Sequence, residues 1–291
     1  MLCAFGLVGS SIQAATVIQN FTAASNDRFA DNPAFIGSSY DWSGVGRSSD
    51  GRWGTMLSRN AFLSANHFHP GLGSVMSFFP GNDPGATPIT RSVVGGVHIG
   101  STDLWIGYLN SDLPVTIADY DYAQVSVTEA SFLSSVLFLE SAFLGGLSPT
   151  NTGYGAVDAT RQVVATNQLE DFFEDILVSG SIGDVLATIQ NQAGDSAFGY
   201  SLTGYEAQLQ GGDSGSPLML VDGGNLVVAG IAWAIGTVDI DPSGVTVNRP
   251  ITVFTYTGSY ANQILVLIPE PSTAGLVGFA GIAMLARRRK D

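Results

Sequence analysis

The sequence QGGDSGSP at residues 210–217 holds one serine, Ser214, between an aspartate and a glycine. Glycines on both sides allow positive φ angles and a close approach of the backbone, so a neighbouring N–H group can point at a developing oxyanion. The same composition is typical of an ordinary surface turn, because Gly, Asp, Ser and Pro all favour turns. The stretch therefore indicates a nucleophile only if the chain also supplies a base and an acid that orients this base.

The positions of the histidines narrow the choice of base. The chain has three of them, all before the serine: His67, His69 and His98. A serine hydroxyl needs an adjacent base to act as a nucleophile near neutral pH, and the single lysine lies in the last few residues. A histidine that precedes its serine excludes the α/β-hydrolases, in which the histidine follows. Their G-x-S-x-G motif also fails, because Ser216 stands where the second glycine should be.

Two further stretches supply a base and an acid. FLSANHF at residues 62–68 is an apolar run that closes on a histidine, and STDLWIGYL at residues 101–109 sets an aspartate at the head of an apolar strand. In order, spacing and local sequence, these stretches and QGGDSGSP resemble the chymotrypsin-like (trypsin-fold) serine proteases. The motifs of that family read roughly T-A-A-H-C, D-I-A-L-L-x-L and G-D-S-G-G-P.

The resemblance assigns a role to each catalytic group. It implies that His67 is the general base, that Asp103 fixes the tautomer of this histidine, and that Ser214 is the nucleophile. The backbone N–H groups of Gly212 and Ser214 would form the oxyanion hole. His69 is then expected to be a loop histidine. The remaining histidine, in a strand-like run, is expected to be a core or edge residue rather than a ligand.

A strand after the nucleophile extends the resemblance to the substrate pocket. LVVAGIAWA at residues 226–234 is similar to the strand that usually ends in S-W-G in this family. Ala232, Trp233 and Ala234 would form an edge for an extended peptide, with alanine narrowing the pocket mouth where the family has glycine. Gln208, six residues before the nucleophile, would lie at the pocket floor. It is neither the aspartate of Lys/Arg-specific members nor a small residue, so the specificity stays open.

The activation step also stays open. In zymogen members of the family, the residue that matches Asp213 pairs with a newly exposed N-terminus, usually I-V-G-G. Residues 16–19 of this chain read TVIQ and do not match that pattern. Either an arginine serves Asp213 instead, or the mature chain begins elsewhere.

Length and composition favour an all-β protein with a sizeable core. The chain has 291 residues, of which 45% are apolar, and short apolar runs broken by Gly, Asn, Asp and Ser are typical of a β-barrel or sandwich. The resemblance implies two six-stranded antiparallel β-barrels within a protease domain at residues 15–268. Barrel 1 is expected at about residues 16–114 and barrel 2 at about residues 155–257.

Two helices are expected beside the strands. Residues 169–177, LEDFFEDIL, have helical spacing with acids in the first turn and Asn167 as a plausible N-cap, which predicts a helical insertion. A solvated face is favoured over a calcium site for its acids, since no alternating Asp/Asn-Gly loop accompanies them. Residues 259–268 resemble the C-terminal helix of the family.

Charge and motifs exclude several other functions. A formal net charge of −14 argues against a nucleic-acid partner. The pair His67 and His69 lacks the spacing of a zinc helix, no H-E-x-x-H is present, and no phosphate-loop or dinucleotide motif occurs. We therefore expect neither a metal nor another cofactor.

Both ends of the sequence resemble targeting signals. Residues 1–14 are apolar and end in small residues like a secretory signal peptide, although a positively charged n-region is absent. A buried first strand is the alternative. Cys3 lies in this segment, so the mature chain would have no cysteine and no disulfide. Residues 269–291 read PEPST, an apolar run and RRRK, and closely resemble the PEP-CTERM sorting signal of bacterial envelope proteins.

The C-terminal resemblance implies partners and a location. An exosortase-type enzyme would recognise the tail, which would associate transiently with the inner membrane through its short apolar run, with the basic end in the cytoplasm. An ordinary tail anchor is the alternative. The sequence thus predicts a secreted bacterial serine endopeptidase acting on polypeptides. A non-catalytic envelope or matrix protein that keeps the fold, and an esterase using the same serine, are the rival interpretations.

Overall fold

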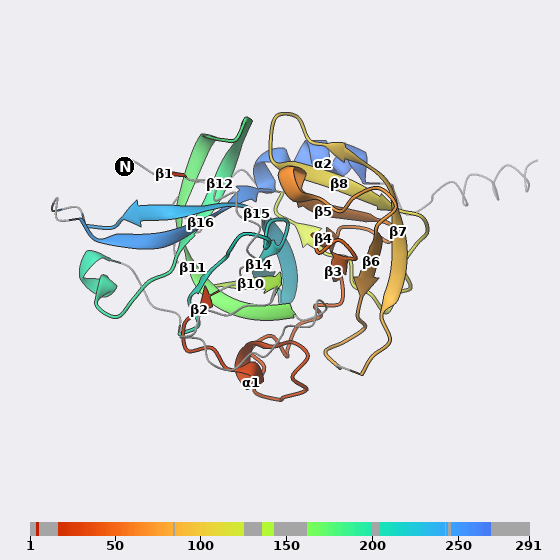
Figure 1. Ribbon diagram of the computed structural model, residues 1–291, viewed down its shortest axis with the longest axis horizontal. Coiled ribbons are helices and arrows are strands. Elements are labelled where there is room, and N and C mark those ends of the chain that lie inside the picture. The colour runs from red at the N-terminus through yellow and green to blue at the C-terminus, as the bar shows by residue number, and fades with distance from the viewer. Residues whose placement is uncertain are drawn as a thin grey trace, which may run out of the picture.

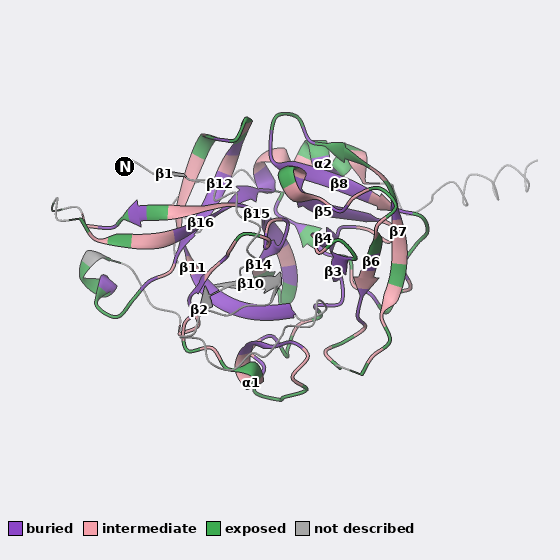
Figure 2. Ribbon diagram, viewed as in Figure 1, coloured by how far each residue is buried: buried purple, intermediate pink, exposed green. Residues whose placement is uncertain are grey.

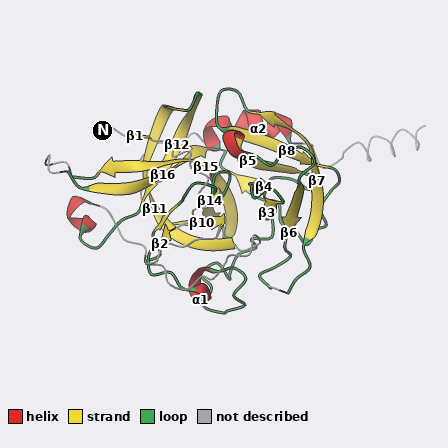
Figure 3. Ribbon diagram, in the orientation of Figure 1, coloured by secondary structure: helices red, strands yellow, loops and turns green. Residues whose placement is uncertain are grey.

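The computed structural model (Figure 1) describes residues 4–5, 17–83, 85–124, 136–142, 162–199, 204–241, 243 and 246–268. Within this part of the chain, strands dominate and the helices are few and short (Figure 3). The prediction of an all-β protein is confirmed for these residues. The predicted sorting signal at residues 269–291, and all of the predicted signal peptide except residues 4–5, lie outside the described residues.

A closed barrel of six antiparallel strands forms the first half of the fold. The strands hydrogen-bond in the order β3-β4-β5-β8-β7-β6, and pairing of β3 with β6 closes the ring. A six-stranded barrel was predicted for this part of the chain and is confirmed. Its strands are β3 (Val45–Ser48), β4 (Trp53–Met56), β5 (Ala61–Ala65), β6 (Val75–Phe78), β7 (Ile89–His98) and β8 (Leu104–Leu109).

Aromatic rings fill the barrel, and small residues make room for them. A Cβ atom on Gly107 of β8 would come within 2.3 Å of the rings of Phe62 and Trp105. These two rings pack against each other with their centroids 5.7 Å apart. Packing therefore explains the glycine at this position, because large and small side chains must alternate for a barrel core to reach native density.

The second half of the described chain forms an eight-stranded sheet. Seven strands follow the order β1-β15-β14-β10-β11-β12-β16, β9 pairs with β15, and β15 also pairs with β16. These strands are β1 (Ala4–Phe5), β9 (Asp121–Tyr122), β10 (Val136–Ala142), β11 (Gln162–Val178), β12 (Ser181–Ile189), β14 (Pro217–Asp222), β15 (Asn225–Asp239) and β16 (Asn248–Tyr256). A separate two-stranded sheet joins β2 (Val17–Ile18) to β13 (Ala207–Gln208).

The predicted helical insertion at residues 169–177 is wrong, because this segment belongs to strand β11. The register between β11 and β12 shifts twice, between Leu169 and Asp171 and again between Phe173 and Ile176. Each shift inserts an extra residue into the strand. The apolar positions are consequently three or four residues apart instead of two, which imitates the period of a helix.

The expected N-cap of that helix has another role. Asn167 is fully buried in β11, where its side-chain amide donates to the backbone oxygen of Ala207 over 2.9 Å. The side-chain oxygen of Asn167 accepts from the backbone N–H of Ala207 over 2.6 Å. Asn167 therefore holds β13, the strand that carries Gln208, against the large sheet.

The C-terminal helix is confirmed. Helix α2 (Ala261–Leu267) follows a short 3₁₀ turn, η4 (Gly258–Tyr260). It lies beside β8 of the barrel, where the Tyr108 hydroxyl donates to the backbone oxygen of Leu267 over 2.9 Å (Figure 1). The other α-helix, α1 (Ala23–Asn26), is a single turn. No helix in the described ranges has the length and apolar character that crossing a membrane requires.

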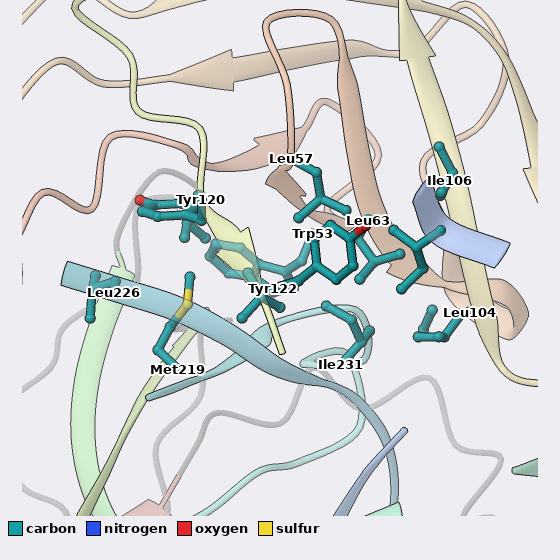
Figure 4. Close-up of a cluster of buried hydrophobic side chains, with 14 of the residues drawn as sticks. Trp53, Leu57, Leu63, Leu104, Ile106, Tyr120, Tyr122, Met219, Leu226 and Ile231 are labelled. Atoms are coloured by element: carbon teal, nitrogen blue, oxygen red, sulfur yellow. The ribbon is translucent and has the colours of Figure 1, made fainter. Parts of the chain in front are cut away.

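One buried cluster joins the barrel to the sheet. Figure 4 shows Trp53, Leu63 and Leu104 of the barrel facing Met219 and Ile231 of strands β14 and β15. Strand β5 is buried along its whole length and β8 along nearly all of it, as the burial colours of Figure 2 show. The two halves therefore share a hydrophobic core, and the residues at the ends of β5 and β8 lie where the halves meet.

Candidate active site

Strand pairing in the barrel brings the predicted base and acid together. Strands β5 and β8 are antiparallel, and the last residue of β5, Ala65, pairs with the first residue of β8, Leu104. The residues that follow β5 therefore lie beside the residues that precede β8. The backbone N–H of Asn66 donates to the backbone oxygen of Asp103 over 2.8 Å. His67 then sits in the short 3₁₀ turn η1 (Asn66–Phe68), next to this aspartate.

The three predicted catalytic side chains form a continuous chain of hydrogen bonds. Nδ1 of His67 lies 2.7 Å from Oδ2 of Asp103, and its Nε2 lies 2.9 Å from Oγ of Ser214. The other carboxylate oxygen, Oδ1, accepts from the backbone N–H of His67 over 2.9 Å. The Asp103 side chain is wholly buried, whereas that of His67 is 34% exposed. The carboxylate thus fixes the ring, while the edge facing the serine stays accessible.

The turn that carries Ser214, residues 210–216, is held from both sides and is called the nucleophile turn after the role predicted for this serine. The Asp213 carboxylate accepts from the backbone N–H of Gln210 over 2.9 Å, and the N–H of Asp213 donates back to the oxygen of Gln210 over 3.1 Å. The N–H of Gly215 donates to the oxygen of Ala232 over 3.0 Å, and the N–H of Ala232 donates to Ser216 over 2.9 Å. The turn is therefore fixed to strand β15 immediately after Ser214.

The backbone conformation and the close packing at position 215 both require glycine. Its φ is 89°, in the left-handed region that side chains with a Cβ disfavour. A Cβ atom there would lie 2.8 Å from Oγ of Ser64 and 3.3 Å from the backbone nitrogen of Ala65. The close approach brings the serine turn onto the end of β5, from which the histidine projects.

The predicted oxyanion donors stand on either side of Asp213. Gly212 has a φ of 104°, a conformation that suits glycine. Among the described residues, the backbone N–H groups of Gly212 and Ser214 donate to no protein acceptor. Two such amides beside a nucleophile are the arrangement that stabilises a tetrahedral oxyanion.

A buried arginine interacts electrostatically with the aspartate of the turn. Arg47 of β3 is 6% exposed and Asp213 is fully buried. Burial lowers the pKa of Arg47 to about 10, and the negative charge of Asp213 opposes this shift. The guanidinium carbon also lies 5.4 Å from the ring centroid of Trp53. The sequence raised an arginine as one of two possible partners for Asp213, but no local motif singled out Arg47.

The expected pocket floor, Gln208, is half-buried on β13. Its side-chain oxygen accepts from Nε2 of Gln210 over 3.1 Å. The next residue, Leu209, donates its backbone N–H to the Thr252 hydroxyl of β16 over 3.3 Å. Two glutamine side chains in this arrangement present polar, uncharged groups beside the nucleophile turn.

The three residues of the expected peptide edge differ in their surroundings. Ala232 uses its backbone N–H and oxygen to hold the nucleophile turn. Trp233 is 4% exposed and belongs to a buried apolar cluster with Val185, Ile251 and Val253. Ala234 is half-buried. The stretch of β15 beyond Ala232 is therefore the part whose backbone could meet a peptide.

The two other histidines are not part of the hydrogen-bonded chain of Asp103, His67 and Ser214. The ring of His69 stacks on Trp105, with centroids 4.1 Å apart and planes 10° apart. His98 lies exposed on β7, and its Nε2 contacts the backbone oxygen of Thr102. Within the described ranges, no group of three or more His, Cys, Asp or Glu side chains could hold a metal ion.

Comparison with known proteins adds no relative. No protein-family model matches the chain, and no curated protein matches it. What the site does must therefore be argued from its own geometry.

Proposed function

We propose that the protein is a serine endopeptidase that hydrolyses peptide bonds through an acyl-enzyme. The observation that carries this proposal is the hydrogen-bonded chain from Asp103 through His67 to Ser214. The two amides at Gly212 and Ser214 support it, because an acyl-transfer site needs donors for the oxyanion as well as a nucleophile.

The reaction follows from these positions. Oγ of Ser214 attacks the carbonyl carbon of the scissile bond while its proton passes to Nε2 of His67. Nδ1–H of the resulting imidazolium donates to Asp103, and the carbonyl oxygen, now negative, accepts from the amides of Gly212 and Ser214. His67 returns the proton to the leaving amine. Water then attacks the acyl-enzyme with the same histidine as base, which restores the free serine.

The proposal includes a two-barrel, chymotrypsin-like fold. The closed barrel supplies the base and the acid, and the sheet supplies the nucleophile. The strand ladder β15-β14-β10-β11-β12-β16, together with the pairing of β16 with β15, supports a second ring of six strands. A catalytic group assembled between two such units is the arrangement that the sequence resemblance implies.

A fluorophosphonate probe tests the activated serine directly. We expect the full chain to be labelled at neutral pH, and the Ser214→Ala and His67→Ala variants to remain unlabelled. Asp103→Asn should slow labelling by about three orders of magnitude or more, because the imidazole loses its correct tautomer. Two matched controls should label like the wild type: His69→Ala, two residues from the base, and Asp112→Asn, an exposed aspartate of the same half. Labelling that survives Ser214→Ala would sink the assignment.

The labelling experiment, together with a comparison of substrates, distinguishes the endopeptidase from two rival functions. A non-catalytic envelope or matrix protein that retains the fold would show no labelling in any variant. An esterase would be labelled but would cleave ester substrates while leaving matched amide substrates intact. Comparing the kcat/KM for an amide and an ester of the same peptide separates this possibility from the endopeptidase.

Export to the cell envelope is part of the proposal. It rests on the signal-like segment at residues 1–14 and on the PEP-CTERM-like tail at residues 269–291, which an exosortase-type enzyme would process after transient association with the inner membrane. Mass spectrometry of the protein from its native cells would test both cuts. Intact termini on the extracellular protein would contradict them.

A further inference from the structure

The short turn that carries His67 depends on contacts from outside it. Turn η1 spans Asn66–Phe68, and the residue before it, Ala65, makes no capping hydrogen bond with its side chain. At the start of the turn, Asp103 accepts the backbone N–H groups of Asn66 and His67 over 2.8 and 2.9 Å. A single 3₁₀ turn has little stability of its own. Contacts at its other end therefore help to decide how firmly the imidazole is held.

Arg52 holds this other end from the connection between β3 and β4. Its Nη1 donates to the backbone oxygen of His69 over 2.6 Å, and its guanidinium carbon lies 4.9 Å from the ring centroid of Phe68. These are the two residues that follow His67. A hydrogen bond from a charged donor is stronger than a neutral one, and a cation over an aromatic ring adds a further attraction. Arg52 therefore restrains the chain immediately behind the imidazole.

The arginine is itself held in place. Its backbone N–H donates to the Ser48 hydroxyl over 2.9 Å, and its backbone oxygen accepts from the N–H of Ser48 over 2.8 Å. Its Nε lies 3.6 Å from Oδ2 of Asp50, and the same carboxylate oxygen accepts from the N–H of Gly71 over 3.1 Å. The connection between β3 and β4 thus contacts three of the four residues at 68–71.

We propose that Arg52 is a positioning residue, which fixes the turn of His67 in the geometry that proton transfer from Ser214 requires. His67 then lies between two anchors, Asp103 before it and Arg52 after it. Because Arg52 contacts Phe68 and the backbone of the next residue, it acts through the turn and not on the reacting atoms. The effect on the reaction rests on the proposed function, whereas the restraint on the turn does not.

The strength of these contacts separates positioning from stability. The Arg52 and Asp50 side chains are 34% and 35% exposed, and ion pairs at such exposure contribute little to the free energy of unfolding. A small displacement of a catalytic base, in contrast, lowers the rate steeply, because proton transfer needs the reacting atoms within hydrogen-bond distance. Loss of Arg52 should therefore slow the reaction more than it destabilises the fold.

Arg52→Met tests this role, because methionine keeps an unbranched side chain beside the Phe68 ring and removes the charge and the N–H donors. The maximal rate constant of fluorophosphonate labelling should fall about five- to tenfold, and the probe concentration that gives half of this rate should stay unchanged. Arg52→Lys keeps a cation and a donor, and a single acceptor does not need the fork of a guanidinium, so this variant should recover most of the lost rate.

Two controls separate the turn from the loss of an arginine in general. Arg91 on β7 of the same barrel also donates to backbone oxygens, those of Asp112 and Thr90. Arg91→Met removes comparable hydrogen bonds that do not involve the turn, so it should label like the wild type. His69→Ala should do the same, because Arg52 bonds to the backbone oxygen of His69, which alanine retains.

Hydrogen exchange measures the restraint without catalysis. The N–H groups of Asn66 and His67 are bonded to Asp103 and exchange when the turn opens. Their exchange is followed by NMR on the full chain with Ser214→Ala as background. It should be about five- to tenfold faster in Arg52→Met than in Arg91→Met, and close to the wild-type rate in Arg52→Lys.

The outcomes of the two measurements are distinct. Equal exchange rates in Arg52→Met and Arg91→Met would overturn the inference, as would a wild-type labelling rate in Arg52→Met. An equal fall in labelling in Arg91→Met would also overturn it, because the cause would then be a weakened barrel. Absence of labelling in every protein, with exchange changed as expected, would instead refute the proposed function and leave the restraint on the turn established.

Discussion

At the level of single residues, the buried charges behind the nucleophile turn matter most for the catalytic proposal. Asp213 lies between the two predicted oxyanion donors and is completely buried, and Arg47 of strand β3 in the barrel interacts with it electrostatically. A carboxylate buried in this way is costly unless a positive charge compensates it. Arg47 can therefore supply the charge that a newly cut N-terminus supplies in zymogens. The turn would then be in its active form without proteolysis.

Replacing Arg47 tests this arrangement. Arg47→Met should lower the free energy of unfolding by about 3–5 kcal/mol, because Asp213 loses its compensating charge, and should slow fluorophosphonate labelling. The double variant Arg47→Met/Asp213→Asn should recover part of the stability that Arg47→Met loses, because no uncompensated charge is then buried. It should not recover the labelling rate, because the ionic interaction that anchors the turn is still missing. Urea denaturation and labelling kinetics measure the two effects. Arg52→Met serves as control for stability, because this arginine side chain is 34% exposed, and a stability loss equal to that of Arg47→Met would contradict the prediction.

The grouping of His67, Asp103 and Ser214 was predictable from sequence because each of these residues sits in a local pattern. His67 closes an apolar strand, Asp103 opens one, and Ser214 stands in a glycine-rich turn. Arg47 has no such pattern around it. Its role depends on strand pairings that bring residue 47 within electrostatic range of residue 213, and single-sequence patterns do not encode interactions between residues so far apart. The same reason hides Asn167, which was expected to cap a helix and instead fixes β13.

At the level of elements, β11 shows where periodicity misleads. Short strands such as β8 were predicted from clean apolar runs, and these predictions hold. β11 is 17 residues long and contains two register shifts, so its apolar residues fall at helical spacing while the backbone stays extended. Asp175 at the second shift has a φ of 53°. Bulges are a property of pairing with a neighbour, here β12, and a sequence pattern cannot reveal them without that neighbour.

Glu170 on β11 makes the stability of this sheet dependent on pH. Burial raises the pKa of Glu170 to about 7, with Glu206 and Asp171 adding to the shift and a hydrogen bond from Asn191 opposing it. The Asn191 amide lies 2.7 Å from the carboxylate. Because the folded chain holds the proton more tightly, this group contributes its full stability below pH 4.5 and loses it as the pH rises through 7.

We expect Glu170→Gln to remove this dependence. In wild-type protein, the contribution of Glu170 to the free energy of unfolding should fall by about 1–3 kcal/mol between pH 5 and pH 8. Solvent reaches part of this side chain and screens its charge, which keeps the loss within this range. The glutamine variant should be more stable than wild type at pH 8 and similar at pH 5. Denaturant titrations at the two pH values measure the difference. Glu174→Gln, an exposed neighbour on the same strand, is the control, and an equal gain there would show that the effect is general charge repulsion.

At the scale of the whole molecule, the proposed catalytic group depends on how the barrel and the sheet pack together. The proposed base and acid come from the ends of β5 and β8, and the proposed nucleophile comes from the turn before β14. The shared cluster of Figure 4 lies between these elements and contains buried residues of both halves. A displacement of either half would lengthen the 2.9 Å contact between His67 and Ser214. Under the proposed function, the shared core would therefore position the catalytic side chains as well as stabilise the fold.

If the two halves share one core, they should unfold together. Ile231 of β15 is 1% exposed and lies in the shared cluster with Trp53 of the barrel. Ile231→Ala should lower the free energy of unfolding by about 2–5 kcal/mol, through lost burial and the cavity left behind. In a Trp233→Phe background the remaining tryptophans, Trp42, Trp53 and Trp105, all belong to the first half of the chain, so their fluorescence reports on that half and, through Trp53, on its contact with the sheet.

The midpoint of denaturation followed by this fluorescence should shift by the same amount as the midpoint followed by far-UV circular dichroism, although the substitution lies in the sheet. Coincident transitions from two probes are the test of a single cooperative unit. The control is Val221→Ala on the neighbouring strand β14, where the side chain is 38% exposed. With either probe, this substitution should change the free energy of unfolding by no more than about 0.5 kcal/mol. If the fluorescence midpoint stayed in place while the dichroism midpoint fell, the barrel would fold independently of the sheet, and the 2.9 Å contact between His67 and Ser214 would need another explanation than a common core.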